Sequence, residues 1–216
     1  TYPTKNDAAL LDSENHIAYV NGYNDGTVRP EAKITRAEAA TMFYRLLNED
    51  VKAEYETDEN EFSDVSEADW YCTAVSTLAN IGIFGGYPDG SFRPDAYITR
   101  AEFAAICARI DGEDADETAE YSDIDGHWAA DEISRVAELG WVKGYTDGTF
   151  RPNQQITRAE AMAVINRITE RNPETKADLL DSMKTWVDNT EDKWYYIDVQ
   201  EATVAHDYER KDNGRE

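Results

Sequence analysis

The sequence predicts a mostly α-helical fold built from three repeated units that pack around a shared core. Two observations support this prediction. One segment occurs three times with a helix-start signal in each copy, and a second, helix-like element also occurs three times. A single unit of this size has too little apolar surface to fold alone, so the units should depend on one another.

The first element combines a tight turn with the start of a helix. Its copies read GYNDGTVRPEAKITRAEAATMFYRLL from Gly22, GYPDGSFRPDAYITRAEFAAICARI from Gly86 and GYTDGTFRPNQQITRAEAMAVINRI from Gly144. The Asp-Gly pair favours a tight turn, and the Arg-Pro pair keeps the chain extended. In TRAE, threonine and glutamate have the spacing of a capping box. Helices should therefore begin after Thr35, Thr99 and Thr157.

The second element places an aromatic residue, an aspartate and a tryptophan ahead of a helix. Its copies read FSDVSEADWYCTAVSTLANIG from Phe62, YSDIDGHWAADEISRVAELG from Tyr121 and WVDNTEDKWYYIDVQEATVAHD from Trp186. Apolar residues at helical spacing follow the tryptophan in the first two copies. Gly82 and Gly140 fit the glycine preference at helix C-termini.

The order of the two elements indicates a permuted arrangement. The second element precedes the first in the two later units, but the copy of the first element at Gly22 has none before it, and the copy at Trp186 has no turn segment after it. We expect the C-terminal copy to supply the helix that the first repeat lacks; an unfinished fourth repeat is the alternative. The stretch from His16 to Val20 stands in the missing place and is expected to be a short strand.

Charge and composition exclude several classes of function. The chain has 21 Lys and Arg against 45 Asp and Glu, a net charge of −24, which excludes a nucleic-acid binder with a broad basic surface. No apolar run of roughly eighteen residues is present, so no membrane insertion is expected.

Three segments connect the units: residues 48–61, 111–120 and 169–185. The first two are strongly acidic and are expected to be solvated spacers rather than metal sites. The third is expected to be partly helical.

The start of the chain indicates a longer parent. The chain begins at Thr1 and shows no signal segment, so we expect a piece of a longer or processed parent.

The two cysteines of the chain, Cys72 and Cys107, are too few for a disulfide framework and lack zinc-site spacing. We expect buried free thiols, and a disulfide within the repeat is the alternative.

The combined pattern resembles the bacterial S-layer homology (SLH) family from Tyr19 to Asp207. Three copies of GYxDGxxRP followed by ITRAE, alternating with aromatic-x-Asp and Trp helices, carry the resemblance. It implies a single domain over residues 1–216, a pseudo-threefold helical prism with a central helix bundle and short loops or hairpins. The motifs would span 10–47, completed by 186–207, then 62–110 and 121–168.

The resemblance also implies a function outside the cell. SLH domains anchor larger surface proteins, without covalent bonds, to secondary cell-wall polysaccharide of the bacterial cell surface. That polymer often ends in pyruvylated N-acetylmannosamine, and the grooves between neighbouring motifs would bind it. A structural self-assembly or protein-interaction module without glycan binding is the alternative.

Residues that recur in all three copies are the candidates for ligand binding. An arginine in the first turn of a helix opposes the helix dipole, so its repetition suggests a use such as binding a carboxylate; pairing with an acid across the repeat interface is the alternative. Tryptophans could stack on sugar rings and aspartates accept from hydroxyls, or they could be core anchors and helix caps. Tyrosines of the turns could line the same grooves. The candidates are Arg36, Arg100, Arg158, Asp64, Asp123, Asp188, Trp70, Trp128, Trp194, Tyr23, Tyr87 and Tyr145.

Catalysis and metal binding are the weaker alternatives. A glycosidase would use paired carboxylates. However, a catalytic centre is normally unique in a chain, whereas every candidate here recurs, and no nucleophile elbow, P-loop, HExxH or Cys-His constellation is present. The NDG, PDG and TDG turns lack the acids of an EF-hand loop. We therefore expect no enzyme activity, no cofactor and no metal.

Overall fold

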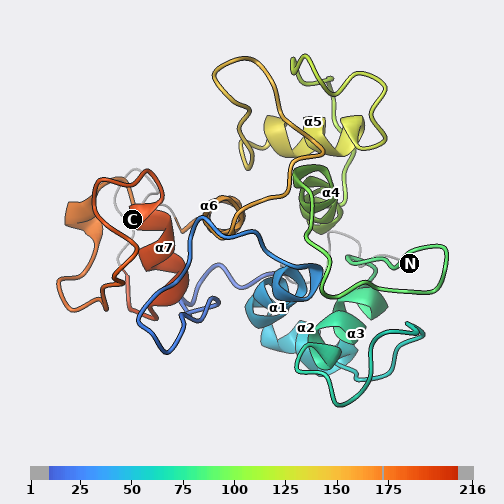
Figure 1. The fold of residues 1–216 in the computed structure, drawn as a ribbon, viewed down its shortest axis with the longest axis horizontal. Coiled ribbons are helices and arrows are strands. Elements are labelled where there is room, and N and C mark those ends of the chain that lie inside the picture. Colours follow the sequence, from blue (N-terminus) through green and yellow to red (C-terminus); the bar gives the residue numbers. More distant parts are fainter. Residues whose placement is uncertain (1–9, 172, 209–216) are drawn as a thin grey trace. The chain divides into compact units, whose positions relative to one another are not determined.

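The computed structural model describes residues 10–171 and 173–208, and within them the fold is mostly α-helical, as predicted (Figure 1). Strand-like pairing in these ranges is confined to isolated bridges, such as that between Thr35 and Tyr97. None of the helices described has the length and apolar character needed to span a bilayer. The helices are α1 (Arg36–Leu46), α2 (Glu49–Tyr55), α3 (Cys72–Ile81), α4 (Arg100–Asp111), α5 (Ala130–Glu138), α6 (Arg158–Ile168), the 3-10 turn η1 (Lys176–Asp178) and α7 (Tyr196–Thr203).

The chain divides into two compact units. One contains residues 34–156 together with Leu10, and therefore the helices from α1 to α5. The other contains residues 11–33 and the described residues from 157 onward, and therefore α6, η1 and α7. The pseudo-threefold arrangement, the central helix bundle and the motif boundaries remain predictions.

The capping boxes predicted at the TRAE segments are all formed. In each, the threonine side chain accepts from the backbone N–H of the glutamate at 3.2 Å, and the glutamate side chain accepts from the backbone N–H of the threonine. Both orphan amides at the helix start are thereby satisfied. The capped helices are α1, α4 and α6, with caps Thr35, Thr99 and Thr157.

Each capped helix packs against a helix of the second element. In the first unit α3 lies beside α1 and α5 lies beside α4; in the second unit α7 lies beside α6 (Figure 1). The apolar stripes of the sequence form these contacts, and Leu78, Val136 and Val199 are fully buried. In the first unit Phe43 of α1 also contacts Phe103 of α4, with ring centroids 5.5 Å apart. The predicted helical stripes are therefore core.

Within the second unit, the end of α7 is hydrogen-bonded to the segment before the first turn. The backbone N–H groups of Tyr19 and Val20 both donate to the carbonyl oxygen of Ala202 at the end of α7. The prediction of a strand from His16 to Val20 is wrong, because the last two residues of this stretch give their backbone donors to a helix end instead of a neighbouring strand.

Two of the connecting segments contain short helices. The acidic stretch 48–61, expected to be a solvated spacer, contains the helix α2, which was not predicted from the sequence. Glu49 and Asp50 lie in the first turn of α2, where the helix dipole favours acids, and no residue of α2 is buried. The stretch 169–185 was expected to be partly helical, and its described residues form the short 3-10 helix η1.

Both cysteines are buried and free, which confirms the first of the two alternatives. Cys72 lies at the start of α3 and Cys107 inside α4. Burial raises the pKa of the Cys107 thiol. Both therefore act as small apolar core residues.

Candidate functional site

The repeated turn is closed by its own backbone and by its aspartate. In the copy at residues 86–93, the N–H of Tyr87 donates to the carbonyl of Ser91 at 2.8 Å, and the N–H of Gly90 donates to the carbonyl of Tyr87 at 2.9 Å. The Asp89 carboxylate accepts from the backbone N–H and the hydroxyl of Ser91. Gly90 has a φ of +80°, which glycine adopts without strain. The copies that begin at Gly22 and Gly144 repeat these bonds.

The aspartate of the second element accepts two hydrogen bonds from the backbone at the end of this turn. The Asp64 carboxylate accepts from the backbone N–H groups of Phe92 and Arg93, at 2.7 and 2.8 Å. The helices α3, α5 and α7 have no side-chain cap at their starts, so these aspartates are not helix caps. We call them turn clamps, because each accepts hydrogen bonds from two consecutive backbone N–H groups of a turn segment. The equivalent clamps are Asp123 on Phe150 and Arg151, and Asp188 on Val28 and Arg29.

The aromatic residue two positions before each clamp packs on the first glycine of the turn. A Cβ at Gly86 would lie 2.4 Å from Cε1 of Phe62. Only glycine leaves room for the ring at this position. The same approach occurs between Tyr121 and Gly144, and between Trp186 and Gly22.

The candidate arginines are buried and donate to backbone carbonyls of a turn. The side chain of Arg36 is 7 % exposed; its Nε donates to the carbonyl of Phe92 at 2.8 Å and its Nη2 to that of Gly85 at 2.7 Å. Its Nη1 lies 3.8 Å from the Glu102 carboxylate. Burial lowers the pKa of this guanidinium, while Tyr87 and Glu102 act in the opposite direction. Arg100 donates equivalently to Phe150 and Lys143, and Arg158 to Val28 and Asn21.

Each turn tyrosine lies between two arginines. The guanidinium carbon of Arg93 is 3.8 Å from the centroid of the Tyr87 ring, and that of Arg36 is 4.9 Å from it. Cations over an aromatic face are attracted by its quadrupole. Tyr145 lies in the same way between Arg151 and Arg100, and Tyr23 between Arg29 and Arg158.

The arginines before proline were assigned no role from the sequence, and in the structure they lie over the rings of the turn tyrosines. Arg93 has a φ of +58°, uncommon for a residue with a side chain, and its side chain is 49 % exposed. Its Nη2 pairs with Asp89 at 2.8 Å. Recurrence of Asp-Gly-x-x-Arg-Pro in all copies was the available signal. The equivalent pairs are Arg29 with Asp25 and Arg151 with Asp147.

The three candidate tryptophans are exposed, so they are not core anchors. Trp70, Trp128 and Trp194 are 68, 60 and 64 % exposed. Each packs edge-on or tilted against a neighbouring ring, as Trp194 does on Tyr195 at 5.3 Å. The hydroxyl of Tyr195 donates to Glu31, two residues after Arg29, which ties this segment to the turn.

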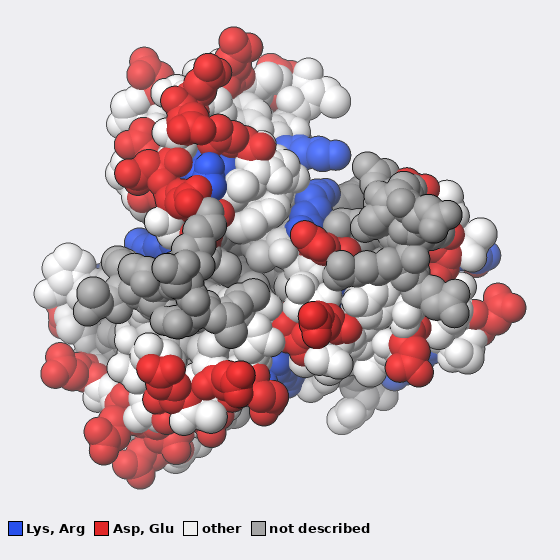
Figure 2. Space-filling view, turned by 180° about the vertical axis from the view of Figure 1, so that it is seen from behind, with Lys and Arg blue, Asp and Glu red and all other residues white. Residues whose placement is uncertain are grey.

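Figure 2 shows how sparse the positive charge is on one face of the molecule. Acidic side chains cover much of the visible surface in groups, whereas lysine and arginine appear as isolated side chains. Because the chain has a net charge of −24, the arginines of the turns supply positive charge locally, and local charge decides which anion can approach.

Recurrence of the same clamped turn, stacked tyrosine and exposed tryptophan defines a helical repeat module. The family model of the S-layer homology domain matches residues 18–40, 61–104 and 120–162. The chain therefore belongs to the S-layer homology domain family.

The chain is similar to segments of several longer proteins. The chain is 38 % identical over 208 residues to the cellulosome-anchoring protein of Acetivibrio thermocellus, covering 93 % of this chain and 45 % of that protein. It is 36 % identical to cell surface glycoprotein 1 of the same organism, over 95 % of this chain and 9 % of that protein. A match to an amylopullulanase of Thermoanaerobacterium thermosulfurigenes, 36 % identical, covers 71 % of this chain and 8 % of the enzyme. The chain thus spans less than half of each of these relatives.

Proposed function

We propose that this chain is a non-catalytic module that anchors a larger surface protein to the bacterial cell wall by binding secondary cell-wall polysaccharide. Membership of the SLH family and similarity to a protein named for cellulosome anchoring support this proposal. The chain would then work outside the cell, at the cell surface. The amylopullulanase would carry the module as an attachment and not as its catalytic part.

The exposure of the three candidate tryptophans is the main structural observation behind the proposed polysaccharide binding. A large apolar side chain that is more than half exposed loses the stabilisation that burial would give it, and here the same loss recurs at three equivalent positions. An indole braced by a neighbouring ring offers a flat, preorganised face on which a sugar ring can stack. We assign this role to Trp70, Trp128 and Trp194.

An anionic group on the polymer would meet the arginine and tyrosine stack of the turn. In one site, Arg93 is half-exposed and presents a guanidinium fork that can pair with a carboxylate such as a pyruvyl ketal. The guanidinium carbon of Arg36 lies 4.9 Å from the Tyr87 ring centroid; its Nε donates to the carbonyl of Phe92, and its charge adds to the local positive potential. Asp64 keeps the turn in place. The corresponding residues of the other copies would act alike.

Co-sedimentation with purified, protein-free Gram-positive cell-wall sacculi tests the proposal. We expect the chain to sediment with untreated walls and to remain in solution after hydrofluoric acid has removed the secondary polymers. Alanine at Trp70, Trp128 and Trp194 should abolish binding. The matched control, alanine at the exposed Tyr97 and Leu180, should bind like the original chain.

Two results would count against polysaccharide anchoring. Binding that survives removal of the secondary polymer would point to another wall component. A folded chain that does not bind walls of its own host, while it associates with itself or with another surface protein, would favour the self-assembly alternative.

A further inference from the structure

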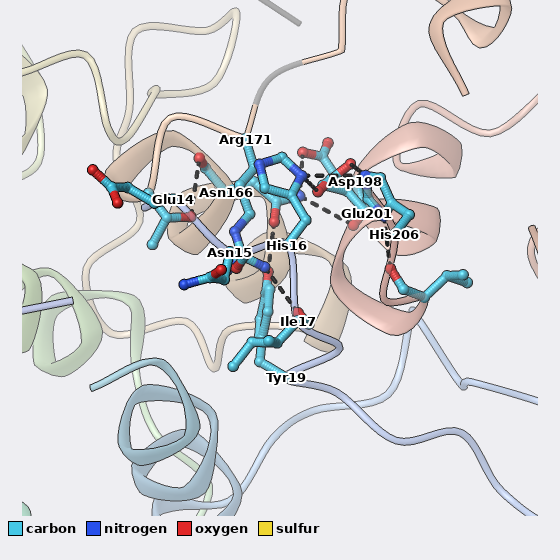
Figure 3. A network of polar contacts seen from close by, with 12 residues as sticks. Glu14, Asn15, His16, Ile17, Tyr19, Asn166, Arg171, Asp198, Glu201 and His206 are labelled. Carbon is cyan, nitrogen blue, oxygen red and sulfur yellow. Dashed lines mark hydrogen bonds and ion pairs between the residues drawn. The ribbon is translucent and has the colours of Figure 1, made fainter. Parts of the chain in front are cut away.

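Two histidines and one glutamate meet in the interior of the second unit. The His16 Nδ1 lies 2.7 Å from Oε1 of Glu201 and 3.2 Å from Nε2 of His206, and that Nε2 lies 3.2 Å from Oε2 of Glu201. The side chains of His16 and Glu201 are fully buried, and that of His206 is 8 % exposed. Figure 3 shows the three groups pointing toward one another from the His16 loop, from α7 and from the segment after α7.

The separations match those between neighbouring ligands of a small tetrahedral cation. Zinc bonds to nitrogen and oxygen of about 2.0–2.1 Å in a tetrahedron place ligand atoms about 3.3 Å apart. The observed separations of 2.7–3.2 Å need only a slight outward movement of the donors to reach this value.

The orientation of His206 leaves an electron pair pointing into the cluster. Its Nδ1 lies 2.9 Å from the carbonyl oxygen of Val204. Because a carbonyl oxygen can only accept, Nδ1 carries the proton, and Nε2 of the neutral ring is an acceptor. That nitrogen faces the Glu201 carboxylate, which also needs a donor or a cation. A histidine whose second nitrogen donates to a carbonyl is the usual arrangement around a bound metal.

The Glu201 carboxylate is buried between the two imidazoles, with Oε1 2.7 Å from His16 Nδ1 and Oε2 3.2 Å from His206 Nε2. A buried anion of this kind requires compensating positive charge. Protons shared with the imidazoles provide it when no metal is present, and a divalent cation would provide more.

The loop that carries His16 is held in position before any ligand arrives. Arg171 is fully buried and donates to the carbonyls of Ile17 and Asn15, at 2.9 and 2.6 Å (Figure 3). The backbone N–H of His206 donates to the carbonyl of His16, and the Tyr208 ring stacks on the His16 ring at 3.9 Å. The three donors are thus preorganised, which reduces the conformational entropy lost on binding.

We propose that His16, Glu201 and His206 bind one divalent transition-metal cation, with zinc as the ion that this donor set fits best. Two imidazoles and one carboxylate suit zinc, whereas calcium and magnesium prefer sites made of oxygen alone. The cation would join residues that are 190 positions apart in the sequence, so it would stabilise the folded second unit. This inference is independent of wall binding.

Zinc titration of the full chain, after chelator treatment and dialysis, tests the proposal. We expect one zinc per chain by calorimetry and a higher Tm with zinc chloride than with calcium or magnesium chloride. His206→Gln and His16→Gln should each weaken binding at least tenfold. The remaining histidine, His127, gives the matched control, since it lies in the first unit near Asn153 and His127→Gln should bind zinc like the original chain.

A spectroscopic measurement on the unsubstituted chain covers the case in which these variants do not fold. Bound cobalt(II) should give the visible absorption of a tetrahedral site without the thiolate charge-transfer band that Cys72 or Cys107 would add. Absence of the tetrahedral bands, presence of a thiolate band, or equal zinc affinity of a folded His206→Gln and of His127→Gln would each overturn the proposal.

Discussion

Asp64 accepts a hydrogen bond from the backbone N–H of Phe92 at 2.7 Å, across 28 residues of chain. The same carboxylate also accepts from the next N–H, so one side chain fixes the backbone where a turn passes into an extended segment. Because the clamp recurs in all three copies, it sets the geometry on which the stacked tyrosines and arginines depend.

Removal of this clamp should destabilise the fold. Asp64→Ala leaves two backbone N–H groups without their charged acceptor, and we expect a loss of about 1–3 kcal/mol in the free energy of unfolding. Asp64→Asn keeps one acceptor oxygen and should lose less. Urea unfolding followed by circular dichroism measures both. Glu67→Ala, an exposed acid of the same loop, is the control, and a loss as large as that of Asp64→Ala would contradict the clamp.

The glycine beneath the aromatic ring provides a second, steric test. Gly86→Ala would place a Cβ 2.4 Å from the Phe62 ring and 2.9 Å from the carbonyl oxygen of Ser91, so we expect a loss of about 1–3 kcal/mol in stability. Gly85→Ala is a closely matched control, since a Cβ at Gly85 would contact nothing within 4 Å. Equal unfolding midpoints for the two variants would show that the ring can move aside.

The buried cysteines should be inert in the folded chain. Burial hides both sulfurs and raises the pKa of Cys107, and the thiolate is the form that reacts. A thiol reagent such as Ellman's reagent at pH 8 should label neither cysteine in native buffer and both in concentrated urea. Rapid labelling of Cys107 in the native chain would contradict its placement inside α4.

The turn aspartates should make stability depend on acid. Hydrogen bonds from Thr27 and then Arg29 lower the pKa of Asp25 from 3.8 to about 2, and Asp147 is lowered to about 2 by Thr149 and Arg151. A carboxylate with a lowered folded pKa contributes stability above its unfolded pKa and loses it as the pH falls through the folded value. We therefore expect this contribution at pH 4 and above, and its loss toward pH 2.

NMR titration of the aspartate carboxyl carbons measures these pKa values directly. Midpoints near 2 for Asp25 and Asp147 are expected, and midpoints near 3.8 would mean that the hydrogen bonds to the turn residues are not maintained in solution.

Wall binding should weaken as salt is raised if the half-exposed arginines contact an anionic polymer, because salt screens exposed charges. Replacing Arg93 and Arg151 with glutamine should lower affinity and flatten the salt dependence. The control replaces Lys52 and Lys176 with glutamine, which removes the same charge away from the turns. Binding by the original chain that does not change with salt would contradict the arginine contact and leave stacking on the tryptophans as the source of affinity.

Local signals in the sequence predicted the helix starts well. The threonine and glutamate of each TRAE segment satisfy amides within the same turn, so their spacing alone determines the cap. The helix α2 was missed because an acidic composition was interpreted as a spacer, although acids in the first turn also favour a helix.

Long-range partners could not be predicted in the same way. The recurrence of Asp64 marked it as a candidate, but its acceptor role toward Phe92 depends on how two segments meet in space. His16, Glu201 and His206 carry no recurring spacing, since the first is separated from the last by 190 residues. Only the packing of the His16 loop against α7 brings their donor atoms together.

The arginines of the TRAE helices use main-chain oxygens as their acceptors. The residue that offers the second carbonyl is glycine at 85, lysine at 143 and asparagine at 21, yet each makes an equivalent bond. A carbonyl is present whatever side chain a mutation introduces. Side-chain substitutions at these turn positions therefore leave the bond to the arginine in place, so the three copies can differ in sequence there and keep the same attachment.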